Sequence, residues 1–94
     1  MYREVKDAEA GCELRISDVL CIHTRHSVYE FFVIDPVRVY GMVKGGVVGK
    51  SAQAAFSCAS LATGAKAQLQ IELPAGLRFI TTSPIVSLRH YRSE

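Results

Sequence analysis

The stretch Lys66-Ala-Gln-Leu-Gln-Ile-Glu-Leu73 alternates polar and apolar residues without a break. Successive side chains of a β-strand point to opposite faces, so the apolar residues of this octet share one face: Ala67, Leu69, Ile71 and Leu73. The polar residues, which begin with Lys66, share the other. This pattern predicts a half-buried strand in an antiparallel sheet that has one face in the core and one face in water.

Runs of the same kind occur along much of the chain. They cover residues 19–25, 28–34, 37–43, 77–82 and 85–91, and Gly or Pro turn signals such as Asp35-Pro36 and Gly45-Gly46 separate them. This rhythm predicts an all-β protein, a small, partly open antiparallel β-barrel of about five to seven strands, with room for one short helix. We assign residues 1–11 to an N-terminal arm and residues 12–94 to a single barrel domain.

Residues 51–64 allow two interpretations. Ser51 could cap a helix, alanine is frequent after it, and Gly64 could end that helix. A strand over residues 54–59 followed by a loop agrees better with the strand patterns on either side. We favour the strand and keep the helix as the alternative.

Composition is that of an ordinary folded domain. The 94 residues are 49% hydrophobic and 21% charged, with a formal charge of +2, which is unlike a disordered chain or a dedicated nucleic-acid binder. Three cysteines are an odd number for a disulfide framework, and the charged N-terminus is unlike a signal peptide. No apolar run approaches the roughly 18 residues that cross a bilayer. We therefore expect a cytoplasmic protein without membrane contact and without a cofactor.

Several turn motifs resemble those of a group of small uncharacterised bacterial all-β proteins. The motifs are the hairpin Thr24-Arg25-His26-Ser27-Val28-Tyr29-Glu30-Phe31, Asp35-Pro36, Gly45-Gly46 and the late Thr82-Ser83-Pro84-Ile85. The similarity runs over most of the chain from about residue 14, with a shorter middle segment here. It consists of turn chemistry and strand pattern, so it implies the fold and transfers no functional residue.

Cys21 and His23 are the strongest candidates for a metal site. They fall on the same face of a strand, roughly 6.5 to 7 Å apart along it. His26, Cys12, Cys58 or His90 could complete a tetrahedral zinc site. Structural zinc sites commonly have a second close pair of ligands, which this chain lacks. A zinc-stabilised module is therefore an alternative hypothesis, beside that of a buried cysteine and a histidine at a strand edge.

Catalytic motifs are missing from the sequence. Residues 45–51 end in Gly-Lys-Ser, but a P-loop requires glycine at position 44, where this chain has Lys44. Cys58 could be paired with His90 as nucleophile and base, yet nothing in the sequence selects that pair over others. There is also no Gly-x-Ser-x-Gly nucleophile motif. We therefore expect that the protein is not an enzyme.

The run from Val28 to Ile34 is apolar on both of its faces. With Glu30 in water, three residues face the core, Tyr29, Phe31 and Val33, and three share the outer face, Val28, Phe32 and Ile34. Such a strand is either covered on both sides or part of an interaction surface. The cover could come from the N-terminal arm or from residues 51–64. The leading hypothesis is a non-enzymatic interaction module that contacts an unknown protein partner or a second copy through Val28, Phe32 and Ile34.

Basic residues and a tyrosine on other strands suggest a second kind of partner. The candidates are Arg38, Tyr40, Lys66 and Arg78, with Arg89 or His90 as a further outward residue. Small barrels hold single-stranded nucleic acid by base stacking and phosphate contacts, so weak binding of this kind is a further alternative. Glu30, Glu72 and several glutamines dilute the charge, and an ordinary solvated face would look the same.

Overall fold

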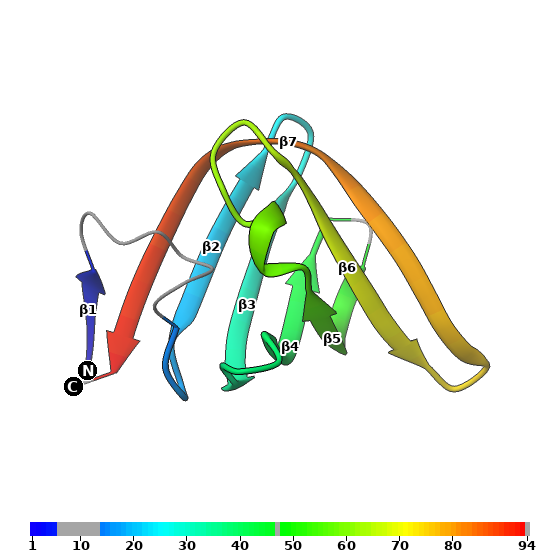
Figure 1. The fold of residues 1–94 in the computed structure, drawn as a ribbon, viewed down its shortest axis with the longest axis horizontal. Helices are drawn as coiled ribbons and strands as arrows, with labels where there is room; N and C mark the ends of the chain where they lie inside the picture. Colours follow the sequence, from blue (N-terminus) through cyan, green and yellow to red (C-terminus); the bar gives the residue numbers. More distant parts are fainter. Residues whose placement is uncertain (6–13, 47, 94) are drawn as a thin grey trace.

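The computed structural model describes residues 1–5, 14–46 and 48–93. It contains antiparallel strands and one short 3-10 turn (Figure 1): β1 (Tyr2–Val5), β2 (Val19–Thr24), β3 (Val28–Asp35), β4 (Tyr40–Gly45), β5 (Gly49–Phe56), η2 (Cys58–Ser60), β6 (Lys66–Leu73) and β7 (Gly76–Ser93). The all-β prediction is confirmed, and part of the predicted N-terminal arm, residues 2–5, forms a strand. Residues 6–11 of that arm lie outside the described residues.

The described strands form one sheet, which closes on itself into a near-ring. Its strand order is β1-β7-β2-β3-β4-β5-β6, and β7 also pairs with β6. The long β7 makes this closure, because its first part pairs with β6 and its second part pairs with β2 and β1. Figure 1 shows β7 passing over the top of the sheet from one flank to the other. The ring is less regular than the barrel we predicted.

The bend in β7 lies where the sequence predicts a break between two strands. Pro84 cannot donate to a ladder, yet the strand continues through it. The Thr82 hydroxyl accepts a hydrogen bond from the Ala67 amide at 3.0 Å and donates to the Ser83 carbonyl at 2.7 Å. The Pro84 carbonyl accepts from the Arg25 amide at 3.0 Å. These bonds replace the missing ladder contacts, so residues 77–82 and 85–91 belong to one bent strand.

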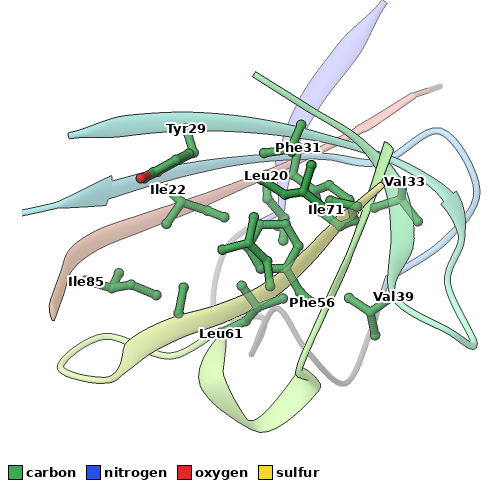
Figure 2. Packing of buried hydrophobic residues seen from close by; sticks show 14 residues of the cluster. Leu20, Ile22, Tyr29, Phe31, Val33, Val39, Phe56, Leu61, Ile71 and Ile85 are labelled. Carbon is green, nitrogen blue, oxygen red and sulfur yellow. The ribbon is translucent and has the colours of Figure 1, made fainter. Parts of the chain in front are cut away.

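The core lies inside the near-ring. Alternate residues of every strand from β2 to β6 face it, which confirms the period-two pattern of Lys66–Leu73 for Ala67, Leu69 and Ile71. Leu73 is half-exposed instead, because β6 has by then left the ring. Figure 2 shows how the buried side chains from opposite sides of the ring meet. The rings of Phe31 and Phe56 are in contact, with centroids 4.7 Å apart at 55°.

Residues 51–64 form a strand and a turn, so the helix alternative is wrong. Ala52, Ala54 and Phe56 follow the core-facing period of two; a helix would need a period near 3.6. The strand begins earlier and ends earlier than the predicted residues 54–59. After it, the Ser60 hydroxyl donates to the Ser57 carbonyl at 2.7 Å and accepts from the Gln68 amide at 2.9 Å, which joins the 3-10 turn to β6.

The segment before β4 is a turn, although we predicted a strand from residue 37. The Asp35 carboxylate accepts hydrogen bonds from the amides of Val37 and Arg38 at 3.1 and 3.4 Å. Val39 has a φ of 50°, in the left-handed region that strands do not use. Val39 is nevertheless buried, and Val37 is almost fully exposed. Asp35-Pro36 therefore starts a local turn that the alternating pattern concealed.

No helix within residues 1–5, 14–46 and 48–93 is long and apolar enough to span a membrane.

Two adjacent phenylalanines offer a matched test of this core. Phe31 is fully buried, whereas Phe32 on the opposite face is 39% exposed. We expect Phe31→Ala to lower the free energy of unfolding by about 3 to 5 kcal/mol and Phe32→Ala to lower it far less. Urea unfolding followed by circular dichroism measures both, since the chain has no tryptophan. Equal losses would contradict the facing of β3 described above.

Candidate interaction surface

The outer face of β3 carries a stripe of exposed apolar side chains. Val28, Phe32 and Ile34 are 49%, 39% and 43% exposed, and the alternate residues Tyr29, Phe31 and Val33 point into the core. The predicted alternation of this strand is confirmed. Of the predicted covers, β1, which is the described part of the N-terminal arm, pairs with β7, and residues 51–64 contain most of β5 and all of η2. Residues 6–11 of the arm lie outside the described residues.

Neighbouring strands extend this stripe sideways. In the sheet register, Phe32 lies between Val19 of β2 and Met42 of β4. These side chains line a shallow hollow of about 260 Å³, together with Glu30 and Lys44. We call the set Val19, Val28, Phe32, Ile34 and Met42 the β3 patch.

The charges beside the β3 patch are of both signs. The Lys44 ammonium lies 3.8 Å from the Glu30 carboxylate, and both side chains are more than half exposed. An exposed pair of this kind contributes little to stability. It does leave one positive and one negative group available at the rim of the patch.

Cys21 and His23 lie together on the outer face of β2, as predicted. The Cys21 sulfur is 3.7 Å from Nε2 of His23. Burial, followed by the nearby Glu30 carboxylate, raises the pKa of Cys21, although Arg89 acts in the opposite direction. A raised pKa disfavours the thiolate that zinc requires. The described residues contain no group of three His, Cys, Asp or Glu side chains that could hold a metal, and Cys12 lies outside them.

The four predicted nucleic-acid contacts do not form one cluster. The Arg38 guanidinium lies over the Tyr40 ring, 5.3 Å from its centroid, and Lys66 shares the outer face of β6 with Gln68 and Gln70. Arg78 pairs in register with the buried Ile71, so it belongs to the core-facing side of the sheet. Lys66 lies five residues before Ile71 along β6, so it is about 16 Å from the position at which Arg78 pairs.

Phe79, an exposed aromatic residue that was not among the predicted contacts, lies on the same outer face as Tyr40. Tyr40, Ala55, Gln70 and Phe79 are successive partners across β4, β5, β6 and β7. Phe79 is 76% exposed. Beside it is a hollow of about 370 Å³ lined in part by Ser57, Gln68 and Thr81. The pattern of residues 77–82 indicated a strand, but the register that aligns Phe79 with Tyr40 comes from pairings across the chain.

A buried cluster of charged side chains joins the start of β2 to the end of β7. Asp18 is 0% exposed and His90 is 3% exposed. Nε2 of His90 is 2.5 Å from Oδ2 of Asp18. Arg92 donates to both carboxylate oxygens, at 3.3 Å and 3.2 Å, and the Arg15 amide donates at 2.9 Å. His90 is thus buried, and Arg89 is the outward residue of that pair.

The protonation of this cluster follows from its contacts. Burial by itself would raise the pKa of Asp18, but the hydrogen bonds from Arg92, His90 and the Arg15 amide together lower it below its ordinary value. Nδ1 of His90 is buried without a hydrogen-bond partner. A proton on Nε2, donated to Asp18, leaves a lone pair rather than an N–H unsatisfied there. Asp18 and His90 are buried and Arg92 is mostly buried, so we interpret the cluster as a structural anchor of the sheet.

The sequence signal for this anchor is faint. Asp18 follows Ser17 in what looks like an ordinary turn, and His90 and Arg92 are two positions apart on the last strand. Asp18 and His90 are 72 residues apart in the chain. Only closure of the sheet brings them together.

No family model, curated protein or solved structure matches this chain at a significant level.

Loss of the Asp18 carboxylate should destabilise the fold in a pH-dependent way. At pH 7 we expect Asp18→Asn to lower the free energy of unfolding by about 3 kcal/mol, because Arg92 loses its buried partner. A carboxylate with a lowered pKa stabilises the fold above its unfolded-state pKa, near 3.8, and this contribution is lost as the pH falls through the lower pKa of the folded state.

Urea unfolding of both proteins at pH 7 and at successively lower pH below 4 measures this difference. The wild type and the Asn variant should converge in stability as the pH falls. A difference that stays constant with pH would mean that the Asp18 charge is unimportant.

Proposed function

We propose that the protein is a non-enzymatic interaction module that associates with a second copy of itself through the β3 patch. The observation that carries the proposal is the exposed stripe of Val28, Phe32 and Ile34 on a strand whose other face is the core. Monomeric proteins keep contiguous exposed apolar patches small, and larger ones mark contact sites. Val19 and Met42 widen the stripe across three strands.

The charges at the rim favour a second copy over an arbitrary partner. In a two-fold symmetric contact each copy presents the same surface in reverse. Glu30 of one copy can then face Lys44 of the other, since the two residues are register partners on adjacent strands. Burial of the apolar residues would supply the affinity, and this charge pattern would set the orientation.

A charge placed in the β3 patch should abolish the association. We expect Phe32→Asp to shift the protein from dimer to monomer, because an unpaired carboxylate would be buried in an apolar contact. Sedimentation velocity over a concentration series, at low and at high salt, measures the state. The wild-type dimer should persist at high salt, since apolar burial is not screened.

Phe79→Asp is the matched control. It places the same charge on an exposed phenylalanine of the outer face, four strand spacings from Phe32, or about 19 Å measured along the sheet, and should leave the dimer intact. A wild-type protein that stays monomeric at all concentrations would refute self-association.

A second candidate function is weak binding of single-stranded nucleic acid. It is supported by the register row that places Tyr40 and Phe79 on one face, three strand spacings or about 14 Å apart along the sheet, with Arg38 stacked on Tyr40. Aromatic rings on a sheet surface stack with bases, and basic residues contact the phosphates. The net charge of only +2 makes such binding weak and salt-sensitive.

An oligonucleotide titration followed by amide-resolved NMR tests this second candidate. If it holds, shifts should cluster at Tyr40 and Phe79 at low salt and shrink at physiological salt. Tyr40→Ala should then weaken binding by about 1 to 3 kcal/mol, and Tyr29→Phe, in the core, should not change it. Shifts absent at both salt concentrations would eliminate the candidate.

A further inference from the structure

The near-ring leaves part of one edge of β5 without a described strand beside it. β4 pairs with β5 from Gly49 to Ala55, whereas β6 pairs with β5 only over Ala54–Phe56. Beyond Ile71, β6 leaves β5 and continues with β7 into a hairpin that projects from the ring (Figure 1). Within the described residues, the β6-facing edge of residues 49–53 therefore has no strand beside it.

The direction of the backbone groups along this edge follows from two hydrogen bonds. The Phe56 amide donates to the Val39 carbonyl on the β4 side, and the Ser57 amide donates to the Gln68 carbonyl of β6. Amide directions alternate along a strand, so those of Ala55 and Gln53 also face the β6 side. Ala55 pairs there with Gln70. Gln53, two positions earlier, directs its N–H and C=O toward a side where no described strand pairs with it.

Beside this edge is a cleft of about 160 Å³ between β5 and the projecting hairpin. Its lining combines apolar residues, Ala52, Ile71, Leu73 and Ile80, with two cations, Lys50 and Arg78. Neither cation forms an ion pair with an acidic side chain of the described residues. Glu72, the acidic residue of the hairpin, lies on the outer face, where it interacts with Tyr40. We call Gln53 and these six lining residues the β5 edge cleft.

We propose that the β5 edge cleft binds an extended acidic peptide segment of another protein, which adds a strand to β5. Strand addition satisfies the open backbone groups of an edge, and side-chain pockets supply the selectivity. On the inward face of the added strand, an apolar residue would contact Ile71 and Ile80. A carboxylate two positions further, on the same face, would contact Lys50 and Arg78.

Charge argues against a second copy of this chain as the occupant. Two β5 edges placed side by side would bring Lys50 and Arg78 of one copy close to the same cations of the other, and like charges across strands are destabilising. The β5 edge cleft also lies on the core-facing side of the sheet, whereas the β3 patch lies on the outer face. The inference therefore does not depend on the proposed function.

The probe is the acetylated, amidated heptapeptide Thr-Val-Thr-Val-Thr-Glu-Thr, compared with the same peptide carrying lysine in place of glutamate. With the glutamate peptide we expect changes in the amide chemical shift of Gln53 and slower hydrogen exchange there. The lysine peptide should bind about threefold more weakly or worse. Lys50→Glu should reverse that preference. Arg25→Glu, which changes an exposed cation of the turn between β2 and β3, should leave it unchanged.

A proline variant tests the strand addition itself. Gln53→Pro removes an N–H that faces the open edge and keeps the pairing with β4, so the fold should survive in the amide spectrum while peptide binding is lost. Three results would overturn the inference: equal binding of both peptides, unchanged binding by Gln53→Pro, or concentration-dependent protection of Gln53 without peptide. The last result would identify a second copy as the occupant. None of these readouts depends on Phe32.

Discussion

The first part of β7 hydrogen-bonds to β6 and the second part to β2, so that a single strand joins both flanks of the sheet. This double pairing converts an open meander into a near-ring and encloses the apolar faces of β2 to β6. The strand can serve both flanks only because it bends between Thr82 and Ile85. There the Thr82 hydroxyl and the Pro84 carbonyl take over hydrogen bonds that a straight ladder would make. The pairings of β1, β2 and β6 with β7 all belong to this closure.

The buried ionic cluster depends on the same closure. Asp18 precedes β2, and His90 and Arg92 lie near the end of β7, so their contacts exist only when those strands are in register. A buried carboxylate with charged donors adds less net stability than its short distances suggest, because each charge has lost its hydration. Its stronger effect is on specificity, since a shift of β7 by one residue would turn His90 outward and leave Asp18 buried without it.

The two proposed contact surfaces arise from opposite properties of the sheet. The β3 patch is on the outer face, where a strand that is apolar on both sides can bury only one of them in a single-layered ring. The β5 edge cleft exists because the ring is incomplete: β6 departs from β5 to form the projecting hairpin with β7. An open edge next to apolar side chains attracts further strands. The two cations at this edge restrict which strands can join.

The all-β class and the facing of most strands were predictable from the residues alone, since period-two alternation reports the environment of each side chain directly. Lys66–Leu73 and Val28–Ile34 are the clearest cases, and the exposed trio of the β3 patch was predicted from them. The alternating pattern predicted the wrong structure where a side chain replaced a backbone hydrogen-bond partner. The Asp35 carboxylate stabilises a turn over residues 36–39, where a strand was predicted, and the Thr82 hydroxyl allows β7 to continue through Pro84, where a break was predicted.

Four features became visible only in the folded protein: the closure by β7, the Asp18 cluster, the row from Tyr40 to Phe79 and the open edge of β5. Each of these depends on which strands become neighbours and in what register. The physical reason is that pairing between distant strands is governed by the closure of the whole sheet, whereas alternation within a strand is set by the strand alone.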